Sequence, residues 1–467
     1  MLSRLLASRV FYLVAAAAMI AAFLLSQLEL SRNPRPRGDA ADIERLRERD
    51  DLNILFILID TLRADRLSTY GYARPTSPTL DALAATGLRF TEHLSQSSWT
   101  KCSMASLWTG LYPARTGVTR SPQALSEEAL LPAEILREAG YRTFAIWRNG
   151  WIHPNFGFSQ GFELYHSPVA RPIPAEVRRE KPTVGVAGTD QDIVFSALEL
   201  LRTHGDQRWF LYLHLMDVHQ YVYDPETALF GTSYSDIYDN SIRWVDRVVG
   251  SLIDDIDSRG LRDRTLIVVA ADHGEAFGEH GREGHARDVY GEVTTTPFIV
   301  SFPFRLEPGI EVDAPTANVD VWPTLLDLLG LPGPSGVDGH SQRAQILAAA
   351  RSQPAAAPSE PTLRFSHLDQ AWGRPAQPAR PMVAVSDGRY RLLKRARDET
   401  GELYDRSLDP LEQRDLASEQ PEVLTRLSAE LERYLEEGEP PWGAAPDVEL
   451  SDSELEQLRA LGYAPEQ

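Results

Sequence analysis

The sequence predicts an α/β protein with a central, mostly parallel sheet and a smaller C-terminal α+β subdomain. Apolar runs without polar alternation occupy residues 52–59, 209–216 and 266–271, which is typical of strands buried on both faces of a parallel sheet. Segments with helix start and stop signals lie between these runs. With 467 residues, of which 43% are hydrophobic and 24% charged, the chain has the composition of a globular protein with two or three domains.

Helix signals separate the predicted strands. Ser77-Pro78 opens a predicted helix over residues 79–86, because proline favours the first helical turn. Further helices are predicted over residues 238–259 and 321–329, and all three segments stop at a glycine. Strands that alternate with helices indicate a layered α/β domain, which we expect over residues 52–348.

The C-terminal third has a different pattern. Residues 349–361 are rich in Ala, Pro and Ser and are expected to form a linker. Strand candidates at residues 382–385 and 390–393 precede a helix candidate at residues 421–435. This order predicts the small α+β subdomain, over residues 362–440.

Both ends of the chain differ from the globular part. Residues 10–25 are continuously apolar, so residues 1–30 are predicted to be a transmembrane signal-anchor, with a cleaved signal peptide or a buried core helix as alternatives. The Pro-rich and charged residues 31–51 are expected to form a solvated tether. The tail, residues 441–467, holds a further helix candidate at residues 451–461.

The sequence gives less direct evidence for the side of the membrane on which the globular part lies. Six arginines lie within residues 32–49, and the positive-inside rule counts them against export of this flank. We still expect a single-pass membrane protein with a periplasmic or extracellular catalytic domain.

Charge and cysteine content exclude some classes of protein. Lys plus Arg number 47 against 67 Asp plus Glu, a formal net charge of -20, so binding of nucleic acid is not expected. The only cysteine, Cys102, cannot form an internal disulfide.

Polar residues follow the buried runs at the points where these end. Asp60 follows the first run, Asp217 and His219 the second, and Asp272-His273 the third. Each residue alone is also consistent with an ordinary cap or turn. Together, at the carboxyl ends of parallel strands, two carboxylates and an imidazole predict a site for one divalent metal ion, Ca, Mn, Mg or Zn.

Thr100 lies where small polar residues run into a short apolar helix that ends at Gly110. Free backbone N–H groups at a helix start favour an anion such as sulfate or phosphate. A nearby cation would activate a hydroxyl at this position as a nucleophile. The alternative is a helix-capping residue with no chemical role.

Several motifs, in this order and spacing, resemble the sulfatase family of the alkaline-phosphatase superfamily, over roughly residues 52–436. The resemblance implies an α/β sandwich with a smaller C-terminal subdomain and a metal-dependent ester hydrolase. The motifs are Asp60-Thr61-Leu62-Arg63-Ala64-Asp65, Ser106-Leu107-Trp108-Thr109-Gly110, Ala271-Asp272-His273-Gly274-Glu275, Gly278-Glu279-His280-Gly281, Gly284-His285 and Asp338-Gly339-His340-Ser341.

The resemblance assigns roles to individual residues. It implies that Asp60, Asp272 and His273 are metal ligands, whereas Thr61 stands where the family has a second Asp. His219 and His285 are implied to bind the oxyanion or to assist the leaving group. Lys101, Asn149, His219 and His285 are assigned to substrate binding, and Thr100, His219 and His285 to catalysis, with Thr100 also a metal ligand.

The nucleophile segment departs from the family pattern of Cys or Ser followed by x-Pro-Ser-Arg, in which the Cys becomes formylglycine. Alignment on residues 105–110 places Thr100 at the nucleophile position, whereas alignment on Cys102 lacks both the Pro and the Arg. We therefore predict a Thr100 nucleophile and keep a formylglycine enzyme using Cys102 as an alternative.

These residues leave several functions open. The leading one is hydrolysis of a sulfate, phosphate or phosphonate ester, with a small-molecule, lipid or glycan ester as substrate. A phosphoethanolamine- or phosphoglycerol-type group transferase at the membrane surface and a catalytically inactive binding protein are the alternatives.

Overall fold

The computed structural model describes residues 35–168, 188–354, 362–395 and 400–449. The chain divides into two units, residues 1–35 and 36–467, and every helix and strand named here belongs to the second. The predicted membrane segment and the helix candidate at residues 451–461 lie outside the described residues. Among the described residues, no helix has the length and apolar character needed to cross a bilayer.

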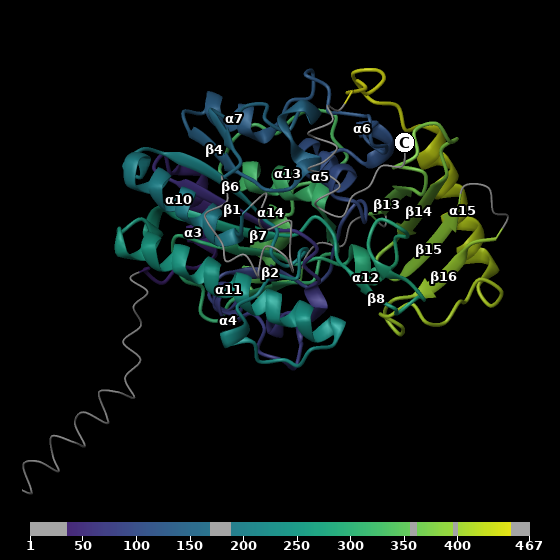
Figure 1. Ribbon diagram of the computed structural model, residues 1–467, viewed down its shortest axis with the longest axis horizontal. Coiled ribbons are helices and arrows are strands. Elements are labelled where there is room, and N and C mark those ends of the chain that lie inside the picture. Colours follow the sequence, from purple (N-terminus) through teal and green to yellow (C-terminus); the bar gives the residue numbers. More distant parts are fainter. Residues whose placement is uncertain (1–34, 169–187, 355–361, 396–399, 450–467) are drawn as a thin grey trace, which may run out of the picture. The chain divides into compact units, whose positions relative to one another are not determined.

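A large sheet forms the centre of this unit (Figure 1). Its eight strands follow the order β11-β2-β10-β7-β1-β6-β4-β5, and β1 pairs in parallel with β6 and β7. β10 is antiparallel to both of its neighbours. The strands are β1 (Asn53–Ile59), β2 (Leu88–Phe90), β4 (Arg142–Ile146), β5 (Leu164–His166), β6 (Trp209–Leu215), β7 (Thr265–Ala270), β10 (Phe298–Ser301) and β11 (Ile310–Val312).

The three predicted strands correspond to β1, β6 and β7, and every residue of these strands is buried. Successive side chains of β1 enter two different cores: Phe56 packs in one and Ile57 in the other. This alternation explains why the strand is apolar from Ile54 to Ile59, since both of its faces are covered by helices.

Helices cover both faces of the sheet (Figure 1). The core that contains Phe56 also contains residues of α5, α7 and α13, and the core that contains Ile57 contains residues of α4, α10 and α11. The helices are α4 (Pro78–Ala85), α5 (Thr100–Thr109), α7 (Pro132–Glu138), α10 (Asp190–His204), α11 (Tyr234–Ser258) and α13 (Asn318–Leu328). The helices predicted over residues 79–86, 238–259 and 321–329 are therefore confirmed as α4, α11 and α13.

The C-terminal subdomain is confirmed as α+β. Strands β13 (Arg364–Asp369), β14 (Pro381–Ser386), β15 (Tyr390–Arg395) and β16 (Glu402–Asp405) form an antiparallel sheet in chain order. Helix α15 (Pro421–Glu436) packs on it, with Leu427 and Leu431 in a small core.

The expectation of a solvated tether is wrong for its C-terminal part. Residues Ala40–Arg45 form α3, capped by Asp39, and Leu46–Glu48 form the 3-10 helix η1. Ile43 and Leu46 are buried in the main core, so the globular unit begins before residue 52. Two apolar side chains in a short helix were too few for a periodic pattern to be visible in the sequence.

Shorter elements complete the unit. α14 extends to Ala350, into the predicted linker, of which residues 355–361 lie outside the described part. The remaining elements are α6 (Pro113–Thr116), α12 (Gly291–Thr294), α14 (Arg343–Ala350), β3 (His93–Leu94), β8 (Ala276–Phe277), β9 (Glu283–Gly284), β12 (Thr316–Ala317), η2 (Ala64–Arg66), η3 (Ser68–Tyr70), η4 (Gly150–Ile152), η5 (Pro154–Phe156), η6 (Pro225–Thr227) and η7 (Arg262–Arg264).

Candidate active site

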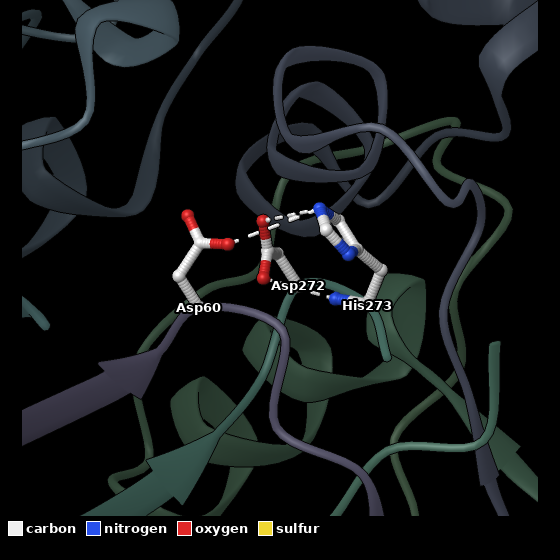
Figure 2. Close-up of side chains that lie close together, drawn as sticks. All are labelled: Asp60, Asp272 and His273. Carbon is white, nitrogen blue, oxygen red and sulfur yellow. Dashed lines mark hydrogen bonds and ion pairs between the residues drawn. The ribbon is translucent and has the colours of Figure 1, made fainter. Parts of the chain in front are cut away.

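Two carboxylates and an imidazole converge at the carboxyl ends of neighbouring strands. Asp60 follows β1, and Asp272 and His273 follow β7, its hydrogen-bonded neighbour in the sheet. Figure 2 shows the three side chains pointing toward one another, and one ligand atom of each lies within 4.8 Å of the others. All three side chains are fully buried.

The hydrogen bonds of this cluster are incomplete in a way that suits a cation. Asp272 Oδ1 accepts from the backbone N–H groups of Thr61 (3.2 Å) and His273 (3.0 Å). Asp60 Oδ1 and Asp272 Oδ2 accept no hydrogen bond from any described residue. Buried carboxylate oxygens almost always have a partner, so these two fit as ligands of a divalent metal ion.

The pKa shifts of Asp60 and Asp272 also fit the binding of a metal ion. Burial raises the pKa of Asp272, and the nearby Asp60 carboxylate raises it further. Burial alone would also raise the pKa of Asp60, but the imidazoles around it hold this pKa below its usual range. Two carboxylates this close repel each other, and a divalent cation between them would remove the repulsion.

Thr100 joins the same cluster. It is the first residue of α5, and its Oγ1 lies 3.2 Å from His273 Nε2. Asn149 Nδ2 donates to Asp60 Oδ2 (2.7 Å) and to Thr100 Oγ1 (3.3 Å). Asn149 was predicted to bind substrate; the structure shows that it links the candidate nucleophile to a candidate metal ligand.

Cys102 faces elsewhere. Its Sγ contacts the backbone oxygen of His367 on β13 at 3.7 Å, and the side chain is buried. Burial raises the pKa of this thiol to about 12, which leaves it protonated at neutral pH. The geometry therefore favours the alignment that places Thr100 at the nucleophile position.

His219 and His285 lie against the cluster, as predicted. The ring centroids of His285 and His273 are 4.6 Å apart, and those of His285 and His219 are 4.9 Å apart. Burial lowers the pKa of His219 to about 4. Burial also opposes protonation of His285, but Glu275, whose Oε1 lies 3.1 Å from His285 Nδ1, raises the pKa of this histidine.

One residue of the site was missed. His214, in β6, places Nε2 3.0 Å from Asp60 Oδ2, while its Nδ1 lies 2.6 Å from the hydroxyl of Tyr212. A histidine near the end of an otherwise apolar buried strand was the available signal, because a buried polar side chain needs a partner.

Lys101 is not placed for substrate binding. Its ammonium group is buried and donates to the backbone oxygens of Ser121 (2.6 Å) and Gln123 (2.7 Å). It also lies 3.8 Å from the ring centroid of Phe156. A side chain one position along a helix from Thr100 points about 100° away from it, which explains why adjacency in the sequence was misleading.

Asp217 does not join the metal cluster either. Its Oδ1 lies 2.7 Å from Arg148 Nη1, and the same nitrogen lies 2.8 Å from Asp190 Oδ1. All three side chains are fully buried, and the one guanidinium is shared by the two carboxylates. Asp217 therefore belongs to a closed ion-pair network beside the site.

Comparisons with known proteins identify a family and several relatives of this chain. The family described as sulfatase matches residues 52–331, and the C-terminal region of N-sulphoglucosamine sulphohydrolase matches residues 278–439. An ulvan-active sulfatase from Formosa agariphila is 26% identical over 64% of this chain and 65% of its own length. An N-acetylgalactosamine-6-O-sulfatase from Bacteroides thetaiotaomicron is 24% identical over 81% of this chain and 92% of its own.

A solved structure extends the comparison to the fold. The phosphonate monoester hydrolase of Agrobacterium radiobacter superposes with a TM-score of 0.64 at 20% identity, covering 83% of this chain and 96% of that protein. The similarity shows that the two chains share a fold.

Proposed function

Because the chain belongs to the sulfatase family, we propose that it is a metal-dependent hydrolase of sulfate, phosphate or phosphonate esters with Thr100 as its nucleophile. The position of Thr100 Oγ1 carries the proposal: it lies 3.2 Å from His273 Nε2, in a cluster with two carboxylate oxygens that accept no hydrogen bond from described residues. The ulvan-active sulfatase and the phosphonate monoester hydrolase among the similar proteins support this range of esters.

The residues present fit one divalent metal ion, with Asp60, Asp272, His273 and Thr100 as its protein ligands. Such a cation supplies positive charge that lowers the pKa of a hydroxyl and offsets the charge of the ester group. Asn149 holds Thr100 Oγ1 and Asp60 in one arrangement through its amide nitrogen. His214, on the neighbouring strand β6, holds the carboxylate of Asp60 through its Nε2.

The reaction then has two displacements. Thr100 Oγ1 loses its proton to solvent and attacks phosphorus or sulfur, and the bond to the leaving oxygen breaks as the new ester bond to Thr100 forms. His285, whose pKa is raised by Glu275, gives a proton to the leaving oxygen. Water attacks the threonyl ester, its second proton returns to that histidine, and Thr100 regains a proton from solvent.

Paired substitutions on α5 test the nucleophile. The full-length protein is loaded in turn with Ca, Mn, Mg or Zn and assayed on a 4-nitrophenyl sulfate, the matching phosphodiester and a phosphonate monoester. Thr100→Ala is expected to lower kcat at least ~1,000-fold on whichever ester is cleaved. Among the described residues, Thr100 provides the hydroxyl group that lies within hydrogen-bond distance of His273 Nε2. Cys102→Ala, two positions along the same helix, is the matched control and is expected to keep most of the activity.

Three outcomes would contradict the proposal. Full activity in Thr100→Ala excludes the threonine nucleophile. Loss of sulfate hydrolysis only in Cys102→Ala means that this cysteine is converted to formylglycine. Transfer of the group to added ethanolamine or glycerol, without release to water, identifies a group transferase.

The membrane location is a separate proposal that rests on sequence. The apolar run of residues 10–25 supports a single anchor, with the catalytic domain outside the cytoplasm. Protease added to intact cells should then degrade the catalytic domain once any outer membrane is permeabilised. Protection until the inner membrane is broken would place the domain in the cytoplasm, as the arginines after this segment favour.

A further inference from the structure

Glu275 contacts His285, which lies beside His273, and also the turn that carries His219. Its side chain is 2% exposed, and its two oxygens have different partners: Oε1 lies 3.1 Å from His285 Nδ1, and Oε2 accepts from the Tyr221 hydroxyl at 2.8 Å. Glu275 comes from the segment after β7, His285 from the segment after β9, and Tyr221 from the turn after β6. One buried carboxylate therefore joins three loops at the carboxyl edge of the sheet.

The bond to His285 fixes the role of each ring nitrogen. An ionised carboxylate can only accept, so His285 Nδ1 carries the proton of this hydrogen bond. Contact between His285 and a substrate must then use Nε2. A ring held at one nitrogen keeps both its tautomer and its plane, which is how a second residue orients a histidine.

The bond to Tyr221 acts on the other histidine. Tyr221 lies two residues after His219 in the same turn, and its φ is +53°, a left-handed conformation that costs a bulky residue free energy. Its hydroxyl, held by Glu275, anchors this turn from the side of His285. The two rings lie with their centroids 4.9 Å apart.

We propose that Glu275 is a positioning residue of the active site, which orients His285 directly and the His219 turn through Tyr221, so that an imidazole nitrogen meets the leaving oxygen of the ester. The inference rests on the proposed function. Glu275 itself acts only through these two residues. Its backbone oxygen accepts from Arg63 Nη1 at 2.8 Å, and a change of side chain leaves this bond in place.

Leaving-group dependence tests the role. A 4-nitrophenyl ester needs little help at its leaving oxygen, whereas the methyl ester of the same group needs a proton there. Glu275→Ala is expected to lower kcat on the methyl ester about 100-fold and on the nitrophenyl ester less than about fivefold. Glu275→Gln keeps an oxygen that can accept from His285 Nδ1 and is expected to restore most of the loss. Tyr221→Phe is expected to shift the ratio of the two rates in the same direction by a smaller factor.

Tyr234→Phe is the matched control. The Tyr234 hydroxyl contacts that of Tyr221 but is not bonded to Glu275, and the residue is 41% exposed. Its activity is expected to stay within about twofold of wild type on both esters, as for most surface changes. Thermal unfolding and bound metal are measured for every variant, because a purely structural role would change these and lower both rates equally.

A nitrogen-15 NMR spectrum of histidine-labelled protein provides a readout besides activity. We expect a protonated Nδ1 signal of His285 in wild type and in Glu275→Gln, and its loss in Glu275→Ala. An unchanged signal, an equal loss on both esters, or no loss at all overturns the positioning role while the wild type remains active. A wild type that hydrolyses no ester refutes the proposed function, and this role with it.

Discussion

Two buried polar clusters lie side by side at the carboxyl edge of the sheet: a closed cluster around Arg148 and an open cluster around Asp60. They differ in how the negative charge of their carboxylates is balanced. In the first, the guanidinium of Arg148 lies between the carboxylates of Asp190 and Asp217. In the second, Asp60 and Asp272 face each other with His273, and no Lys or Arg among the described residues pairs with either carboxylate. All of these side chains are fully buried.

The difference lies in how the carboxylate oxygens are used. Every oxygen of Asp190 and Asp217 accepts a hydrogen bond, from Arg148, from a backbone N–H or from the Trp244 indole. Asp60 and Asp272 each keep one oxygen that accepts none from a described residue. The closed cluster is completed by an arginine of the chain, whereas the open cluster has no such partner among the described residues. This difference supports binding of a cation from solution in the open cluster.

The largest effect on stability is expected when the arginine of the closed cluster is removed. Arg148→Met leaves two buried carboxylates without their cation, so the free energy of unfolding should fall by about 3–5 kcal/mol. Urea unfolding followed by circular dichroism measures the change. The control Arg202→Met, in an exposed pair with Glu199 on α10, should leave the free energy of unfolding nearly unchanged. Equal stability of the two variants would show that the closed cluster contributes nothing.

The next effect concerns the open cluster and its missing charge. A divalent ion that binds only the folded protein should raise the free energy of unfolding by about 2.7 kcal/mol at a concentration 100 times its dissociation constant. Asp272→Asn should remove most of this gain, because an amide nitrogen replaces the Oδ2 that accepts no hydrogen bond. Calorimetric unfolding of both proteins with and without metal gives the answer. If Asp272→Asn gains as much as wild type, the metal binds elsewhere.

The fold was predictable where pattern alone decides it. The mainly apolar character of β1, β6 and β7, without polar alternation, identified strands covered on both faces, and the turn residues after them identified the edge that carries the site. Thr100 was preferred over Cys102 from the alignment on residues 105–110, and the structure places Thr100 Oγ1, not Cys102 Sγ, beside His273. α3 escaped detection, since the short, charged segment that forms it buries only Ile43.

The contacts between distant segments were not predictable. Asp217 and Asp60 both follow a buried strand, yet only the tertiary position of Arg148 decides that Asp217 is neutralised by the chain. Lys101 adjoins the proposed nucleophile Thr100 in sequence, but its ammonium group is held by the 119–124 segment on another side of α5. His214 entered the site because β6 pairs with β1 in the register Leu58↔His214, two residues before Asp60.

The smallest expected change in stability gives the clearest contrast between the open and the closed cluster. In the presence of a chelator, Asp272→Asn removes a charge that Asp60 repels, while the amide oxygen still accepts from the Thr61 and His273 backbones. Its free energy of unfolding should therefore lie within about 1 kcal/mol of the metal-free wild type, or above it. Asp217→Asn, in the closed cluster, should lose stability under the same conditions, because both oxygens of Asp217 accept hydrogen bonds and an amide nitrogen in place of either cannot. A loss in Asp272→Asn as large as in Asp217→Asn would mean that the open cluster is stabilised by the chain itself, and that its two oxygens need no cation.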